Sequence, residues 1–379
     1  MSTLLLKFKI ILNSESISDN TEHPGPLFHR WLPNGMDDAI ILDIENQNAE
    51  LKMWFERMGF IKDEFIEFDY NRQEVEPDVI PQQAILKAGP LMGLLEIREI
   101  SEEELIPLTE NNIGDENFIN FGKKVVNKLI YPSVARFIRI LRTNYCQYWI
   151  QDLEKWDSRR ESLGRYCQKR LQLKWSLDDG NTWSDFVPNK PIGPPLCVEI
   201  TVGFSEIYLE YITSEDWQKL RKAIQDEYDP TTAATFLART NEFLDQGNLK
   251  HALIEGVSAF ELAINEFFRY KTIGDDLFDG MKSFMELSKR AQIISISLAL
   301  GNIPVQDIKN AVNVVDRRNK LIHEGRDPPE KVKGELKSLL NIINKLLIGP
   351  GFKFPKSNPS NSKMSIEAWD SALEDYLEN

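Results

Sequence analysis

The spacing of apolar residues changes once along this chain, and that change limits the folds available to it. Up to about residue 212, short apolar runs alternate with stretches rich in Pro, Asn and Gly. Such runs predict strands, at residues 4–12, 39–43, 83–88 and 94–97. From residue 214 onward, apolar residues recur every three or four positions, as on one face of a helix. The sequence therefore predicts an α+β fold in which a strand-containing part precedes an all-helical part.

We expect three regions along the chain. Residues 1–213 predict an α+β domain with antiparallel strands, with a role in sensing, gating or partner binding. Residues 214–348 predict an antiparallel helical bundle with short loops. Its helices are expected at 214–228, 231–245, 249–270, 281–300, 304–323 and 328–347. Residues 349–379 predict a linker followed by an acidic amphipathic helix, whose apolar face requires a docking site in this chain or on a partner.

Three local patterns add detail to the first region. Ser101 with Glu104 three residues later predicts a capping box at the start of a short helix. A long helix is expected after Pro132, through residues 136–156. The stretch 171–187 predicts a hairpin around Asp-Asp-Gly-Asn, and residues 176–183 match the Asp-box pattern of sialidase propellers. That pattern occurs once and is remote from chemistry in those enzymes, so it favours a hairpin rather than a glycosidase.

Composition excludes several classes of protein. No apolar run approaches the ~18–20 residues that a membrane span requires. The apolar opening is interrupted by Lys7 and Lys9, which favours a first strand over a signal peptide. The chain has 3 Cys and 4 His, none at the spacing of metal ligands. We therefore expect a cytoplasmic protein with free thiols, no metal site and no cofactor.

Charge is distributed unevenly. Residues 15–116 contain 7 basic and 24 acidic side chains, whereas residues 123–190 contain 14 basic and 7 acidic ones. In the basic aromatic segment, residues 123–190, cations alternate with rings that could stack on single-stranded nucleic acid. The RNA-binding candidates are Arg136, Arg139, Arg142, Tyr145, Arg159, Arg160 and Arg165. The alternative is structural, because aromatic residues at helical spacing also form a core stripe with arginines on the wet face.

One helix of the bundle carries a polar interruption. Its apolar stripe follows positions 305, 308, 312 and 315, and the next position is Asn319 rather than an aliphatic residue. His323 lies one turn beyond Asn319, and Arg318 is adjacent. Polar side chains that break a local pattern beside chemically capable neighbours predict a functional site. The alternative is that Arg318 and His323 oppose the helix dipole while Asn319 is a satisfied core amide.

Residues 318–323, Arg-Asn-Lys-Leu-Ile-His, resemble the R-x(4–6)-H motif of the HEPN superfamily (higher eukaryotes and prokaryotes nucleotide-binding domains). The preceding helix pair, with its Ala-rich second helix, is also similar to that family. The resemblance covers residues 231–348 and does not extend to the first 213. In the family, the motif typically forms the active centre of metal-independent endoribonucleases in toxin–antitoxin, antiviral-defence and CRISPR systems, at the junction of two paired domains.

The resemblance implies roles for particular residues. His323 would act as a general base on a ribose 2′-hydroxyl or as an acid on the leaving 5′-oxygen. Arg318 would bind the scissile phosphate, and Asn319 would hold the imidazole or the phosphate. Glu261 and Arg317 would support the site. The products would be a 2′,3′-cyclic phosphate and a 5′-hydroxyl, and DNA would not react because it lacks the nucleophile.

Two functions remain open from the sequence. The first is a hydrolase that cleaves RNA as a homodimer, with an antitoxin or a larger complex as a further partner. The second is a non-catalytic HEPN-type module that dimerises and binds RNA or a protein. Loss of function in a His323→Ala variant would distinguish the first from the second.

Overall fold

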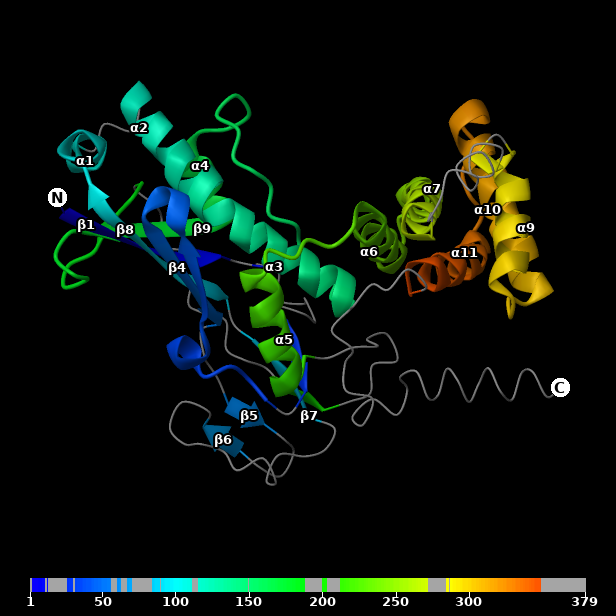
Figure 1. Ribbon diagram of the computed structural model, residues 1–379, viewed down its shortest axis with the longest axis horizontal. Helices are drawn as coiled ribbons and strands as arrows, with labels where there is room; N and C mark the ends of the chain where they lie inside the picture. The colour runs from blue at the N-terminus through cyan, green and yellow to red at the C-terminus, as the bar shows by residue number, and fades with distance from the viewer. Residues whose placement is uncertain are drawn as a thin grey trace. The chain divides into compact units, whose positions relative to one another are not determined.

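The computed structural model describes residues 2–10, 12, 26–29, 31–55, 60–62, 67–69, 84–88, 90–110, 115–148, 150–187, 200–202, 212–271, 284–285 and 287–348. The chain forms two compact units, Met1–Asp229 and Pro230–Phe354 (Figure 1). The first unit contains the sheets and the second contains only helices among its described residues. The expected α+β fold class is therefore confirmed.

An antiparallel sheet of six strands forms the centre of the first unit. Its strand order is β10-β9-β1-β8-β4-β3, and two smaller sheets, β11-β7-β2 and β5-β6, accompany it. Along the chain, the strands are β1 (Ser2–Ile10), β2 (Leu27–His29), β3 (Ile40–Ile44), β4 (Ala49–Phe55), β5 (Phe60–Lys62), β6 (Glu67–Asp69), β7 (Ala84–Lys87), β8 (Leu91–Ile100), β9 (Leu171–Ser176), β10 (Ser184–Asp185) and β11 (Ile200–Val202). The pairs β1–β8, β1–β9, β4–β8 and β3–β4 are all antiparallel.

One face of this sheet is buried because apolar residues alternate along its strands. In β1, Leu4, Leu6, Phe8 and Ile10 are all buried, as period-two alternation requires. Phe8 lies opposite Gly93 of β8, and a Cβ atom at Gly93 would lie 2.0 Å from the Phe8 ring. Glycine at this position therefore makes room for the aromatic ring of the neighbouring strand.

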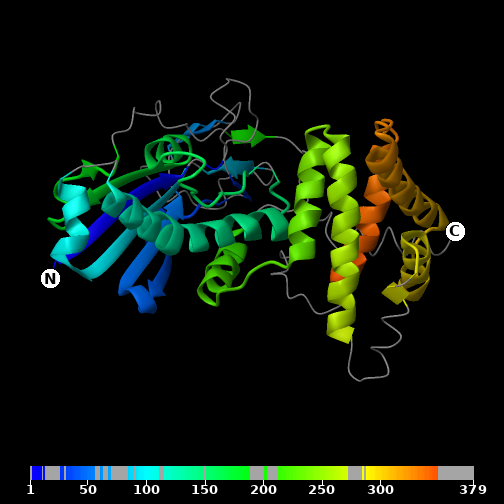
Figure 2. The same cartoon turned by 90° about the horizontal axis from the view of Figure 1, so that it is seen from above.

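Helices cover the buried face of the sheet. The helices of the first unit are α1 (Glu102–Thr109), α2 (Glu116–Gly122), the π-helix η4 (Lys123–Ile130), α3 (Tyr131–Asn144), α4 (Leu163–Lys169) and α5 (Ser214–Gln225). Figure 2 shows α2, the π-helix and α3 as one continuous rod across the strands. Short 3₁₀ turns, η1 (Gly35–Asp38) and η2 (Glu45–Gln47), flank β3. The capping box at Ser101 and Glu104 is present at the start of α1, as predicted.

The long helix expected through residues 136–156 is shorter than predicted. It ends at Asn144, because Cys146 has a positive φ of 52° that an α-helix does not allow. The following segment, residues 145–162, is irregular in its described part. Its carbonyls find donors in side chains, since Arg142 donates to the carbonyls of Ile150 and Tyr148.

Helix α5 belongs to the first unit, although the change in apolar spacing suggested a boundary at residues 213 and 214. Trp217 is fully buried and packs with Phe28, Phe55 and Phe137 at ring-centroid distances of 5.8–6.2 Å. Its indole nitrogen donates to the carbonyl of Asp38 at 3.0 Å. The structure therefore divides the chain at Asp229–Pro230, one helix later than the sequence pattern suggested.

The predicted hairpin forms between β9 and β10, and its turn is held by the Asp-box residues. The Asp178 carboxylate accepts hydrogen bonds from the Ser176 hydroxyl (2.7 Å), the Thr182 hydroxyl (2.6 Å) and the Thr182 amide (2.9 Å). These bonds hold the pKa of Asp178 at about 2, with the Thr182 hydroxyl as the largest cause. Gly180 takes a φ of +83°, which glycine adopts without strain.

The second unit is an antiparallel bundle. Its helices are α6 (Thr232–Asp245), α7 (Leu249–Lys271), α9 (Lys289–Leu300), α10 (Val305–Glu324) and α11 (Val332–Ile348). Small residues on α7, namely Ala252, Gly256, Ala259 and Ala263, are buried where α6 and α11 pack against it. A Cβ atom at Gly256 would lie 2.9 Å from a methyl carbon of Leu336. Small side chains therefore allow the close approach of these helices.

Some predictions fall on residues that the structure does not describe. The linker and tail helix at 349–379 lie wholly outside the described residues, as do Trp149, His23 and Cys197. Between residues 188 and 213, the described residues contain β11 and an isolated bridge from Ile212 to Phe28. Among the described residues, no helix is long and apolar enough to cross a membrane.

Candidate functional site

The candidate motif lies on the last two turns of α10. This helix begins after Pro304 and buries Ala311, Val314 and Val315 against the rest of the bundle. It ends where Gly325 adopts a left-handed conformation, with a φ of +65°, and donates to the carbonyl of Leu321 at 3.1 Å. The residues before this cap, 316–324, therefore have a fixed helical geometry.

Arg318, Asn319 and His323 are brought together at this end of the helix. Asn319 and His323 are exposed and share one face, since they are four residues apart. The Arg318 guanidinium donates to the Asn319 amide oxygen at 3.4 Å, while its own Nε atom is enclosed without a hydrogen-bond partner in the described part of the chain. The Arg318 and Asn319 side chains are thus joined by a hydrogen bond, and Asn319 and His323 are exposed to solvent on one face of the helix.

Asn319 is exposed, which argues against the alternative that it is a satisfied amide in the core. The apolar stripe that starts at Val305 does not remain buried to the end of the helix, because Ile322 is 47% exposed. Asn319 is therefore a surface amide rather than a satisfied core amide. No hydrogen bond or ion pair engages the His323 side chain among residues 2–348 that the structure describes.

The residues immediately before the cluster have structural partners. The Arg317 guanidinium donates to both carboxylate oxygens of Glu335 on α11, which raises the pKa of Arg317. Asp316 accepts a hydrogen bond from Arg290 of α9 at 2.6 Å. Arg317 was expected to support the site, and in the structure its guanidinium pairs with Glu335 and so holds α10 against α11.

Glu261 lies on α7 and forms an ion pair with Lys289, the first residue of α9, at 3.5 Å. Lys289 precedes Arg290, the residue that binds Asp316. Within the described residues, Glu261 makes no contact with Arg318, Asn319 or His323. The structure thus pairs Glu261 with α9 rather than with the three motif residues of α10.

The basic aromatic segment, residues 123–190, uses most of its aromatic rings in the core. Phe137, Tyr145, Trp156 and Tyr166 are buried, so they are not available to stack on bases. The Tyr145 hydroxyl donates to the carbonyl of Asp216 at 3.3 Å. Arg142 is 2% exposed and binds main-chain carbonyls. The prediction that Arg142 and Tyr145 bind RNA is therefore wrong, because both side chains stabilise the fold.

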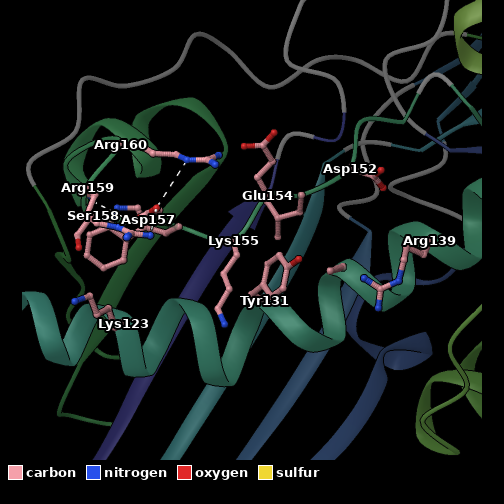
Figure 3. Close-up of a pocket in the computed structure, with 13 residues that line it drawn as sticks. Lys123, Tyr131, Arg139, Asp152, Glu154, Lys155, Asp157, Ser158, Arg159 and Arg160 are labelled. Atoms are coloured by element: carbon pink, nitrogen blue, oxygen red, sulfur yellow. Dashed lines mark hydrogen bonds and ion pairs between the residues drawn. The ribbon is translucent and has the colours of Figure 1, made fainter. Parts of the chain in front are cut away.

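The other arginines of that segment differ in exposure. Arg136 and Arg139 form ion pairs with Asp229, at 3.7 and 2.5 Å. Arg159, Arg160 and Arg165 are exposed. Arg159 donates to both Asp157 carboxylate oxygens at 3.1 Å, and these hydrogen bonds lower the pKa of Asp157. Arg139, Arg159 and Arg160 also line a hollow of about 760 Å³ in the first unit (Figure 3).

Two further residues of this hollow, Lys123 and Tyr131, come from the two ends of the π-helix. The π-helix could not be predicted, since its residues also fit the α-helical period. Tyr131, and Lys155 from the irregular segment that also lines the hollow, are site candidates that sequence reasoning missed. Their position inside the basic aromatic segment was the one available indication.

In the described part of the chain, no three His, Cys, Asp or Glu side chains are grouped so that they could hold a metal ion. Cys146 and Cys167 are free thiols. Burial raises the pKa of Cys167 to about 12, which makes it a poor nucleophile.

A scan against models of known protein families, a search of curated proteins and a search of solved structures each found no match to this chain.

Proposed function

We propose that the second unit is a HEPN-like, metal-independent endoribonuclease domain that acts as a homodimer. The observation that carries the proposal is the position of Arg318, Asn319 and His323 on the last two turns of α10, with Asn319 and His323 exposed and Arg318 half-buried. A guanidinium, an amide and an imidazole at a fixed helix end are the groups that phosphodiester cleavage requires. The exposed His323 has no structural partner in the described chain, which favours a chemical role.

The proposed reaction uses the ribose 2′-hydroxyl as the nucleophile. His323 accepts its proton, the freed oxygen attacks the adjacent phosphorus, and the bond from phosphorus to the 5′-oxygen breaks. Arg318 neutralises the charge that develops on the phosphate oxygens. A second imidazole returns a proton to the leaving 5′-oxygen, and a second copy of the chain supplies it. RNA is cleaved to a 2′,3′-cyclic phosphate and a 5′-hydroxyl, and DNA is inert.

This activity suits a toxin or antiviral-defence effector in the cytoplasm, where free thiols such as Cys146 and Cys167 persist. An antitoxin or a larger complex would hold such an enzyme inactive. In this proposal, Arg165, exposed on the first unit, contributes positive charge for RNA at its surface.

One observation favours a second candidate function. Apolar side chains are exposed on α9 and α10, with Leu298 at 70% and Val305 at 67%. Exposed apolar residues of this size are typical of surfaces that bind another protein. They support the alternative of a non-catalytic HEPN-type module that dimerises and binds RNA or a protein partner.

Cleavage assays on purified protein test the proposal. RNA and the matching DNA oligonucleotide are incubated in EDTA with the wild type and with Arg318→Ala, His323→Ala and His251→Ala variants. His251 is a matched control because it is also an exposed histidine on a helix of the same unit. We expect RNA cleavage with cyclic phosphate ends, reduced by about 10²–10⁴-fold in His323→Ala and unchanged in His251→Ala. Equal cleavage by wild type and His323→Ala contradicts the proposal.

A further inference from the structure

Hydrogen bonds within the first unit hold the lining of its hollow in place. It lies between the rod of η4 and α3 and the irregular segment 152–160 (Figure 3). The Asn127 side chain, from the π-helix, donates to the Trp156 carbonyl at 2.8 Å and accepts from the Trp156 amide at 3.0 Å. The Trp156 indole donates to the Glu161 carbonyl at 3.0 Å. These bonds fix segment 152–160 against the helix, so the hollow is formed without a ligand.

Cations dominate the lining of this hollow. The cations are Lys123, Arg139, Lys155, Arg159 and Arg160, against the carboxylates Asp152, Glu154 and Asp157. Figure 3 shows Lys123, Arg159 and Arg160 at one end, Lys155 and Tyr131 in the middle, and Arg139 at the other end. Among the described residues, no ion pair engages Lys123 or Lys155. Two lysines with no carboxylate of their own therefore remain for an anionic ligand.

The size and the single accessible ring narrow the class of ligand. A volume of about 760 Å³ is within the range of small-molecule sites, ~300–1,000 Å³. Tyr131 is half-buried and presents its ring inside the hollow (Figure 3), whereas Trp156, which also lines it, is buried. One ring suits one base, and a cluster of cations suits a chain of phosphates. A strand of RNA would need further stacking rings and would pass Asp152 and Glu154, which repel its phosphates.

We infer that this hollow binds a nucleoside di- or triphosphate, with its phosphates on Lys123 and Lys155 and its base against Tyr131. The inference goes beyond the proposed ribonuclease activity, because it concerns a different unit and a different ligand. The π-helix is part of the site, since its first residue, Lys123, and the residue after it, Tyr131, both face the hollow. Widened helical turns of this kind are frequently found at functional sites.

Calorimetric titration of the full chain with ATP, in EDTA, tests this inference. The other probes are GTP, tripolyphosphate, adenosine and a ten-nucleotide RNA. We expect saturable binding of a nucleotide with a Kd below about 100 μM, weaker binding of tripolyphosphate and none of adenosine. Lys123→Ala and Lys155→Ala should each weaken nucleotide binding by at least about tenfold. Tyr131→Leu should reduce the preference for nucleotide over tripolyphosphate.

A matched control is Lys128→Ala, because Lys128 is exposed on the same π-helix and does not line the hollow. It should bind nucleotide as the wild type does. The inference is overturned if no nucleotide binds below about 1 mM, if Lys123→Ala and Lys155→Ala bind as tightly as Lys128→Ala, or if the RNA oligonucleotide binds more tightly than nucleotide and depends on the same lysines. Binding is read out without RNA cleavage, so failure here leaves the ribonuclease proposal unaffected, and the reverse also holds.

Discussion

The two units use their conspicuous arginines in opposite ways. In the first unit, Arg142 and Arg170 are enclosed and donate to main-chain carbonyls of the irregular segment that follows α3. In the second unit, the Arg318 guanidinium donates to the side-chain oxygen of Asn319, and no hydrogen bond joins it to a main-chain carbonyl in the described chain. An irregular segment lacks the regular backbone hydrogen bonds of a helix or sheet, so its buried carbonyls require side-chain donors. A regular helix has no such requirement, so its polar groups are free for chemistry.

The largest expected effect separates Arg142 from Arg318. Arg142→Met removes donors to two buried carbonyls and should lower the stability of the first unit by about 3 kcal/mol. Arg318→Met should change stability by less than about 0.5 kcal/mol. Seven of the eight Trp residues lie within residues 1–229 and none lies within 230–354, so Trp fluorescence during urea unfolding reports mainly on the first unit. Equal midpoints for Arg142→Met and wild type would show that the buried guanidinium is dispensable.

The next effect compares the two close approaches that depend on glycine. Gly93→Val places a side chain against the Phe8 ring and should cost the first unit about 2–3 kcal/mol. Gly256→Ala in the bundle should cost about 1 kcal/mol, because the nearest atom is the end of a flexible Leu336 side chain. Trp fluorescence and the helical circular dichroism signal, followed in parallel, measure each variant in its own unit. A double variant Phe8→Leu, Gly93→Val should recover part of the loss, and no recovery would contradict the proposed clash.

Adjacent arginines on α10 provide a sharper comparison within one unit. Arg317→Ala leaves the nearly buried Glu335 carboxylate without its partner and should destabilise the bundle by about 1–3 kcal/mol. Arg318→Ala should leave the bundle stable and reduce only RNA cleavage. Thermal unfolding at 222 nm and the cleavage assay together separate the two. If both variants lose stability equally, the cluster around Arg318 is structural.

The smallest effect is a pH dependence of opposite sign in the two units. Hydrogen bonds from Thr182 and Ser176 lower the pKa of Asp178 to about 2, so its stabilisation is complete above its ordinary pKa and is lost as pH falls through 2. Burial raises the pKa of Asp245 in α6, so its ionisation weakens the bundle at neutral pH, and protonation relieves this. Asp178→Asn should therefore destabilise the first unit at pH 7 and make little difference at pH 2. Asp245→Asn should stabilise the bundle at pH 7, and denaturant titrations at both pH values measure this.

Elements with a clear period were predictable from the sequence. The helices α6, α7, α10 and α11 lie within a few residues of their expected bounds, because each has one apolar face and recognisable ends. The β9–β10 hairpin was predictable from its turn residues. Strand β4, a central strand of the large sheet, was missed, although its burial alternates from Ala49 to Met53 before Trp54 and Phe55 are both buried. The end of α3 was missed because a left-handed Cys146 has no sequence signal.

The candidate sites divide in the same way. The prediction of a site on α10 rests on a polar residue that interrupts an apolar stripe, and the structure places Asn319 and His323 on the surface of that helix. The use of the basic aromatic segment was not predictable, because the same residues suit a nucleic-acid surface and a core stripe. Only the irregular path after Asn144 decides that Arg142 faces inward while Arg159 faces solvent.

Helix α5 has a practical consequence for anyone who expresses the units separately. Strand β3 forms one edge of the large sheet, and α5 covers it, with Gln225 donating to the Ile41 carbonyl at 3.2 Å. The opposite edge ends in the two-residue strand β10, which carries Asp185. A chain cut at residue 213 would uncover the β3 edge and the pocket of Trp217, and an open apolar edge promotes aggregation. A cut after Asp229 leaves both edges protected and should give soluble protein.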